Sequence, residues 1–69
     1  MWKKGTTDGY RWDAKVYEVG SKFGIDNGRV SKLSIYGANG SAIYAYDRGL
    51  DMDNAPEGLV ARVIEAATK

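Results

Sequence analysis

Hydrophobic and polar residues alternate along residues 10–19. A period of two that includes aromatic and β-branched residues is typical of a β-strand with one buried face. The dipeptide Asp8-Gly9 ahead of this segment is typical of a tight turn, so residues 2–6 are predicted to pair back as a short first strand. The buried side of the longer strand is predicted to consist of Tyr10, Trp12, Ala14 and Val16.

Two further strands are predicted over residues 29–36 and 42–48, on either side of the glycine-containing turn at residues 37–40. Residues 20–28 contain three glycines and predict a loop, with Phe23 and Ile25 as anchors that pack beneath it. The inward side of the sheet is expected to continue with Leu33, Ile35, Ile43 and Ala45.

Apolar residues near the C-terminus recur with helical spacing and predict a helix over about residues 55–67. Asn54 and Glu57 resemble a capping box at its start, and residues 51–54 are expected to form an acidic connector. We therefore predict an α+β fold, an antiparallel three- to four-stranded β-meander followed by one C-terminal α-helix. The predicted core consists of Trp12, Val16, Leu33, Ile35, Ile43, Leu59, Val63 and Ile64.

The composition narrows the possible functions. With 69 residues the chain forms a single domain over residues 1–69, its sheet covering about residues 2–48. It contains no cysteine and no histidine, which excludes disulfides, zinc sites of the usual kind and Ser-His-Asp or Cys-His catalysis. No apolar run suits a membrane span or a signal peptide, so we expect no membrane association and a cytoplasmic location.

The net charge of +1 is not that of a strongly basic DNA-binding protein, so any nucleic-acid interface depends on how the charges are distributed. The outward side of the predicted sheet combines cations with tyrosines, a mixture that binds single-stranded nucleic acid through phosphate contacts and base stacking. The same face also fits two other interpretations, an ordinary solvated sheet surface and a surface for a protein partner. The predicted nucleic-acid-binding residues are Arg11, Lys15, Tyr17, Lys32, Tyr36, Tyr44, Tyr46 and Arg48.

Catalysis is a separate hypothesis. Asp13 and Asp47 are expected on neighbouring strands, where one or two carboxylates can hold Mg²⁺. A metal-dependent nuclease centred on Asp13 is therefore an alternative, with Mg²⁺ as its only cofactor. Exposed carboxylates on strands are usually solvated, so the main expectation is a protein without catalytic residues, metal or cofactor.

Two segments resemble known families. Residues 31–36 and 43–48, joined by a glycine turn, resemble the central hairpin of small bacterial members of the positive-cofactor-four, or Whirly-like, single-stranded DNA-binding fold. This resemblance implies a dimer that holds single-stranded DNA across its sheets. It covers about half of the chain and lies in architecture and residue type.

Residues 23–33, together with Tyr46-Asp47-Arg48-Gly49, resemble a small family of uncharacterised bacterial and phage proteins. This second resemblance implies no biochemical activity. Phage proteins of this size include anti-CRISPR proteins, which implies a further alternative, an inhibitor that binds a host defence protein.

The lengths of the predicted elements bear on oligomerisation. A straight strand over residues 10–19 would span about 33 Å, whereas a helix of a dozen residues covers about 18 Å. One helix would then leave part of the apolar face and the sheet edges open. We therefore expect a homodimer, or a tetramer built from dimers.

Overall fold

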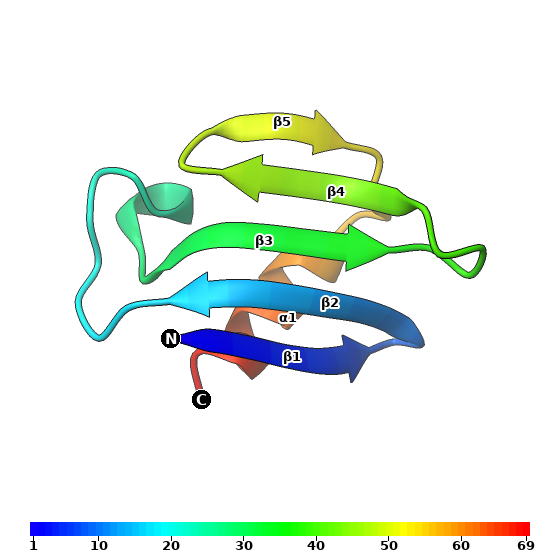
Figure 1. The fold of residues 1–69 in the computed structure, drawn as a ribbon, viewed down its shortest axis with the longest axis horizontal. Coiled ribbons are helices and arrows are strands. Elements are labelled where there is room, and N and C mark those ends of the chain that lie inside the picture. The colour runs from blue at the N-terminus through cyan, green and yellow to red at the C-terminus, as the bar shows by residue number, and fades with distance from the viewer.

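The computed structural model describes all 69 residues as a five-stranded antiparallel sheet with one α-helix across one of its faces (Figure 1). The strands lie in the sheet in chain order, β1-β2-β3-β4-β5, and the α+β class predicted from the sequence is confirmed. The single α-helix has nine residues and is too short to span a membrane. The elements are β1 (Trp2–Thr7), β2 (Tyr10–Val16), the 3₁₀ turn η1 (Ile25–Asn27), β3 (Val30–Tyr36), β4 (Ala42–Asp47), β5 (Leu50–Asp53) and α1 (Leu59–Ala67).

The fifth strand was not predicted from the sequence. The expected acidic connector at residues 51–54 lies largely within β5, whose backbone pairs with β4. All four residues of β5 are exposed, so it lacks the apolar alternation that marks a half-buried strand. A tight turn at Arg48 and Gly49 reverses the chain and makes this pairing possible.

The helix begins at Leu59, later than the predicted start near residue 55. Gly58, which precedes it, has a φ of 81°, a left-handed conformation that glycine adopts without steric cost. The expected capping box does not form, because the helix begins after both of its residues. The backbone N–H of Asn54 instead donates a 2.7 Å hydrogen bond to the Ile43 carbonyl and continues the sheet pairing. Glu57 lies in the turn before the helix.

The core lies between α1 and the sheet. The helix buries Leu59, Val63 and Ala67, one side of its apolar stripe, while Ile64 is only half-buried at the rim. Ile43, also predicted for the core, is likewise half-buried. The sheet side of the core consists of Trp12, Ala14, Val16, Val30, Leu33, Ile35 and Tyr44.

The register of β4 overturns one prediction about the sheet faces. Tyr44 pairs with Ile35 and Tyr46 pairs with Leu33, and directly opposed residues share a face. Both tyrosines therefore face the helix side, and Tyr44 is only 4% exposed. The pairing shifts by one residue next to Tyr36, and such a bulge changes which side of the sheet each residue occupies. The prediction that these tyrosines face outward and Ala45 inward is wrong, whereas Ile43 packs against the core as predicted.

The strand predicted for residues 10–19 ends as β2 at Val16, so it spans only about 24 Å. The mismatch with the length of α1 is therefore smaller than expected. The two edge strands of the sheet, β1 and β5, each have one side that pairs with no other strand. A homodimer or tetramer stays a prediction that rests on these edges.

We expect Gly5→Ala to destabilise the fold. Gly5 lies opposite Trp12, and a Cβ added at residue 5 would lie 2.5 Å from the indole ring. Crowding of this kind costs about 1–3 kcal/mol. Gly49→Ala is the matched control, because nothing lies within 4 Å of its added Cβ. Chemical denaturation should show a loss for the first variant alone, and equal stability for both would contradict this packing.

A second expected outcome concerns alkaline stability. Burial raises the pKa of the Tyr44 hydroxyl above its ordinary value of 10.0, and the Asp53 carboxylate adds to this. The folded chain thus holds this proton more tightly than the unfolded chain, and its contribution is complete below pH 10.0 and lost as the pH rises through the folded pKa. Tyr44→Phe should flatten the fall in unfolding free energy between about pH 9 and about pH 11. Urea titrations check this, and an equally steep fall would contradict it.

Candidate nucleic-acid interface

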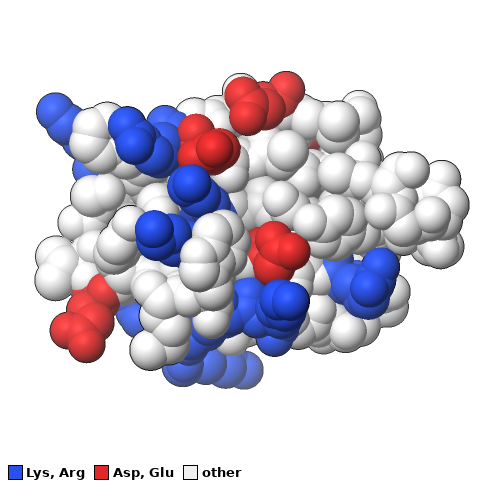
Figure 2. Space-filling view, viewed as in Figure 1, with Lys and Arg blue, Asp and Glu red and all other residues white.

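The face of the sheet turned away from α1, here called the outer face, is built by cross-strand pairs. Lys15 of β2 lies between Trp2 of β1 and Lys32 of β3, and Lys32 lies opposite Asp47 of β4. Figure 1 shows α1 behind the sheet, so the space-filling view from the same side presents the outer face. In Figure 2 most Lys and Arg side chains gather toward the left, over the sheet end where β2 leaves and β3 begins.

The structure places six of the eight predicted binding residues on or beside this face. Four lie on the strands themselves and two lie just beyond strand ends, whereas Tyr44 and Tyr46 lie on the helix side. The strand residues are Arg11, Lys15, Lys32 and Tyr36, and the residues beyond strand ends are Tyr17 and Arg48. The register also brings Trp2 and Lys4 to the outer face, because they pair with Lys15 and Asp13.

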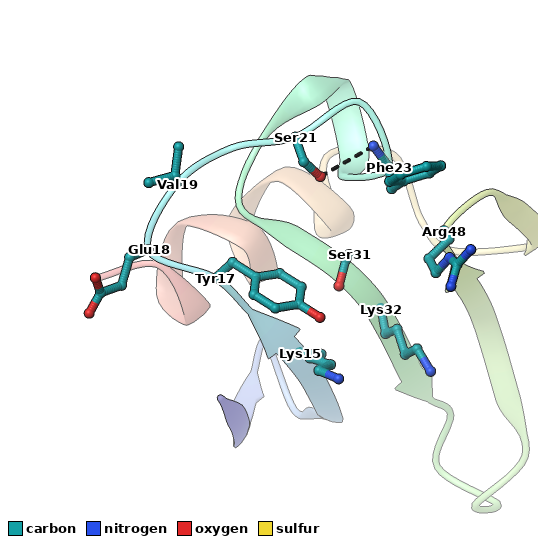
Figure 3. A pocket seen from close by; sticks show the side chains of 9 residues that line it. All are labelled: Lys15, Tyr17, Glu18, Val19, Ser21, Phe23, Ser31, Lys32 and Arg48. Atoms are coloured by element: carbon teal, nitrogen blue, oxygen red, sulfur yellow. Dashed lines mark hydrogen bonds between the residues drawn. The ribbon is translucent and has the colours of Figure 1, made fainter.

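A cleft of about 640 Å³ opens at this end of the sheet, between the strands and the loop of residues 17–29 (Figure 3). Three cations, two aromatic rings and a buried serine contribute to its wall. Phe23, predicted to pack beneath the loop, is instead 46% exposed and lines the cleft. The cleft is lined by Lys15, Tyr17, Glu18, Val19, Ser21, Phe23, Ser31, Lys32 and Arg48.

Arg29 and Tyr46 hold the loop against the body of the protein. The Arg29 guanidinium donates hydrogen bonds to the Tyr17 carbonyl at 2.9 Å and to the Thr68 carbonyl at 3.2 Å. The second contact joins the loop to the end of α1, where carbonyls lack helical partners. The Tyr46 hydroxyl donates to the Phe23 carbonyl at 3.0 Å. Tyr46 thus positions Phe23 from the helix side of the sheet, and its own side chain does not lie on the outer face.

Ser31 occupies a β-bulge in β3. Lys15 pairs with Lys32 and Val16 pairs with Val30, so Ser31 is the extra residue between them. It is 4% exposed, and the Arg48 amide donates to its carbonyl at 2.9 Å. This hydrogen bond ties the β4–β5 turn to β3 and brings Arg48 to the cleft.

Cations of the cleft lie over its rings. The Lys15 ammonium is 5.6 Å from the centre of the Tyr17 ring, and the Arg48 guanidinium is 5.2 Å from the centre of the Phe23 ring. Cation–π attraction at this range orients long side chains that would otherwise move freely in solvent. The cleft therefore presents positive charge and flat apolar surface side by side.

The two acidic residues considered for Mg²⁺ lie apart. Asp13 is on β2 and Asp47 is on β4, and β3 separates them, so the prediction of neighbouring strands is wrong. The meander places β3 between them because the strands follow chain order. Asp13 accepts a 3.1 Å hydrogen bond from the Tyr36 hydroxyl, and Asp47 lies 3.6 Å from the Lys32 ammonium. No group of three or more acidic side chains converges on a common point.

These features define a small α+β protein with one face of its sheet covered by a helix and the other open. Residues 1–68 match a family described as Domain of unknown function (DUF7678), and the chain belongs to this family. No curated protein and no solved structure matches the chain.

Arg48 has a φ of 59°, so its backbone is left-handed, a conformation that costs a non-glycine residue roughly 1–2 kcal/mol. We expect Arg48→Gly to leave thermal stability unchanged or raised, although the variant loses the contact with Phe23. Asp47→Gly, one residue earlier in β4, is the matched control and should destabilise the strand by about 0.5–1 kcal/mol. Thermal melts check both, and an Arg48→Gly protein less stable than the parent would contradict this expectation.

Proposed function

We propose that this protein binds single-stranded nucleic acid on the outer face of its sheet. The observation that carries the proposal is the gathering of cations and exposed rings at one end of that face. Trp2 is 56% exposed, and Tyr17 and Phe23 are each 46% exposed. Exposed aromatic side chains that lie close together mark interaction sites, whereas singly scattered ones do not.

The chemistry of this surface suits an unpaired strand. Lysine and arginine contact phosphates along the backbone, and flat rings stack on bases regardless of sequence. Stacking requires bases that are not already paired, which favours single strands over a duplex. The helix that a major groove could accommodate lies on the opposite face of the sheet. A sheet that carries stacking aromatic residues is also how several single-strand-binding domains work.

The low net charge of +1 is compatible with this proposal because the charges are unevenly placed. Asp51 and Asp53 lie in β5, at the sheet edge farthest from β1, and Glu65 lies on α1. On the outer face itself, Asp13 is engaged by Tyr36 and Asp47 by Lys32.

Salt dependence provides the first test. Fluorescence anisotropy with a labelled single-stranded oligonucleotide should show binding that weakens linearly on a log–log plot as salt rises. Each lost phosphate contact should flatten the slope by about 0.7, so Lys15→Gln should show this change. Glu65→Gln on α1 is the control and should leave the slope unaltered.

Base stacking provides the second test. Tyr17→Ala should weaken binding by about 1–3 kcal/mol without changing the salt slope. Tyr44→Phe should bind like the parent, because residue 44 is buried on the helix side. Absence of any binding up to ~100 μM at low salt, weaker than ordinary non-specific affinity, would rule out the proposal. The outer face would then be assigned to a protein partner, as in the hypothesis of a phage-derived inhibitor.

A further inference from the structure

The cleft is the larger of two hollows on the outer face, and a loop and a turn form its sides. The loop of residues 17–29 forms one side and the turn at Arg48 forms another (Figure 3). Ser31 lies between Tyr17 and Lys32 in this view, on the strand that forms the floor. The other hollow, of about 350 Å³, lies elsewhere on this face and includes Lys4, Arg11 and Tyr36. A nucleic-acid strand lying across the sheet would therefore meet the larger hollow at this end.

Positive groups from three strand ends meet in the cleft. Lys15 comes from β2, Lys32 from β3, and Arg48 follows β4. The Lys32 ammonium forms an ion pair with Asp47 at 3.6 Å, but an ammonium has three donors and can contact a further acceptor. The acidic residue of the lining, Glu18, points away from the other side chains in Figure 3. The three cations together favour an anion at this site.

The Ser31 hydroxyl is a second, independent indication of a ligand. Ser31 is 4% exposed, and its hydroxyl takes no part in the side-chain hydrogen bonds found within the chain. Every side-chain polar atom that is completely buried has a hydrogen-bond partner. The unpartnered Ser31 hydroxyl is therefore accessible to solvent, through the cleft that Ser31 lines. A buried hydroxyl directed at an open site beside three cations is suited to donate to an oxyanion.

We propose that the cleft binds the terminal phosphate of a nucleic-acid strand, an inference that rests on the proposed function. A terminal phosphate monoester carries a charge of about −1.5 to −2 at pH 7 and three acceptor oxygens, whereas an internal phosphate carries one charge. Three cations and a hydroxyl match the monoester better. Tyr17 and Phe23 place flat surfaces beside these groups, where the terminal base stacks.

The test compares three versions of one labelled oligonucleotide, with a 5′-phosphate, with a 3′-phosphate, or with hydroxyls at both ends. One phosphorylated version should bind roughly tenfold more tightly than the hydroxyl version, a preference equal to about 1.4 kcal/mol. The end that confers the preference identifies the source of the phosphate. Equal affinity for all three would overturn the inference while leaving the proposed function intact.

Matched variants locate the preference. Ser31→Ala removes the hydroxyl and should reduce the preference to near unity, whereas Ser34→Ala, on the same strand outside the cleft, should retain it. Lys4→Gln should weaken all three oligonucleotides equally, because Lys4 lies on the outer face but not in the cleft. A preference retained in Ser31→Ala, in a variant that melts like the parent, would also overturn the inference.

If no oligonucleotide binds, titration with a nucleoside monophosphate and with the corresponding nucleoside separates strand binding on the outer face from phosphate binding in the cleft. Binding of the monophosphate alone, lost in Ser31→Ala, would support the cleft as a phosphate site and contradict strand binding. Binding of neither compound would overturn both.

Discussion

The packing of α1 on the sheet decides which surface of this protein is available for binding. Leu59, Val63 and Ala67 are fully buried against one face, and a single nine-residue helix cannot also cover the other. The opposite face therefore remains open, and the polar alternate residues of β2 and β3 lie on it. Contacts on the covered side also hold the open side in shape, since Arg29 and Tyr46 fasten the loop that walls the cleft.

The faces of β2 and β3 could be predicted because their apolar residues alternate without ambiguity. Trp12, Leu33 and Ile35 were expected inside and are buried. β4 could not be assigned in the same way, because tyrosine suits either face of a half-buried sheet and the bulge beside Tyr36 leaves no mark in the pattern. β5 escaped prediction since its pairing depends on backbone hydrogen bonds and not on buried side chains.

Some residues of the candidate site could likewise be predicted from the sequence, and others could not. Lys15 and Lys32 follow from strand alternation alone, and they lie together on the outer face. The parts of the site that sequence analysis missed, Trp2, Phe23 and Ser31, depend on long-range geometry. Phe23 is positioned by a hydrogen bond from a residue 23 positions away, and Ser31 enters the cleft through a bulge between strands. Neither the hydrogen bond to Phe23 nor the bulge at Ser31 can be recognised from the sequence pattern.

The central claim is that the outer face, and not the helix side, binds a single strand of nucleic acid. Amide chemical-shift mapping by NMR with an unlabelled single-stranded oligonucleotide tests it most directly. We expect the largest shifts at Lys15, Tyr17, Ser31, Lys32 and Arg48, with residues of α1 little changed. Shifts concentrated on α1 or along β5, or no shifts at saturating oligonucleotide, would contradict it.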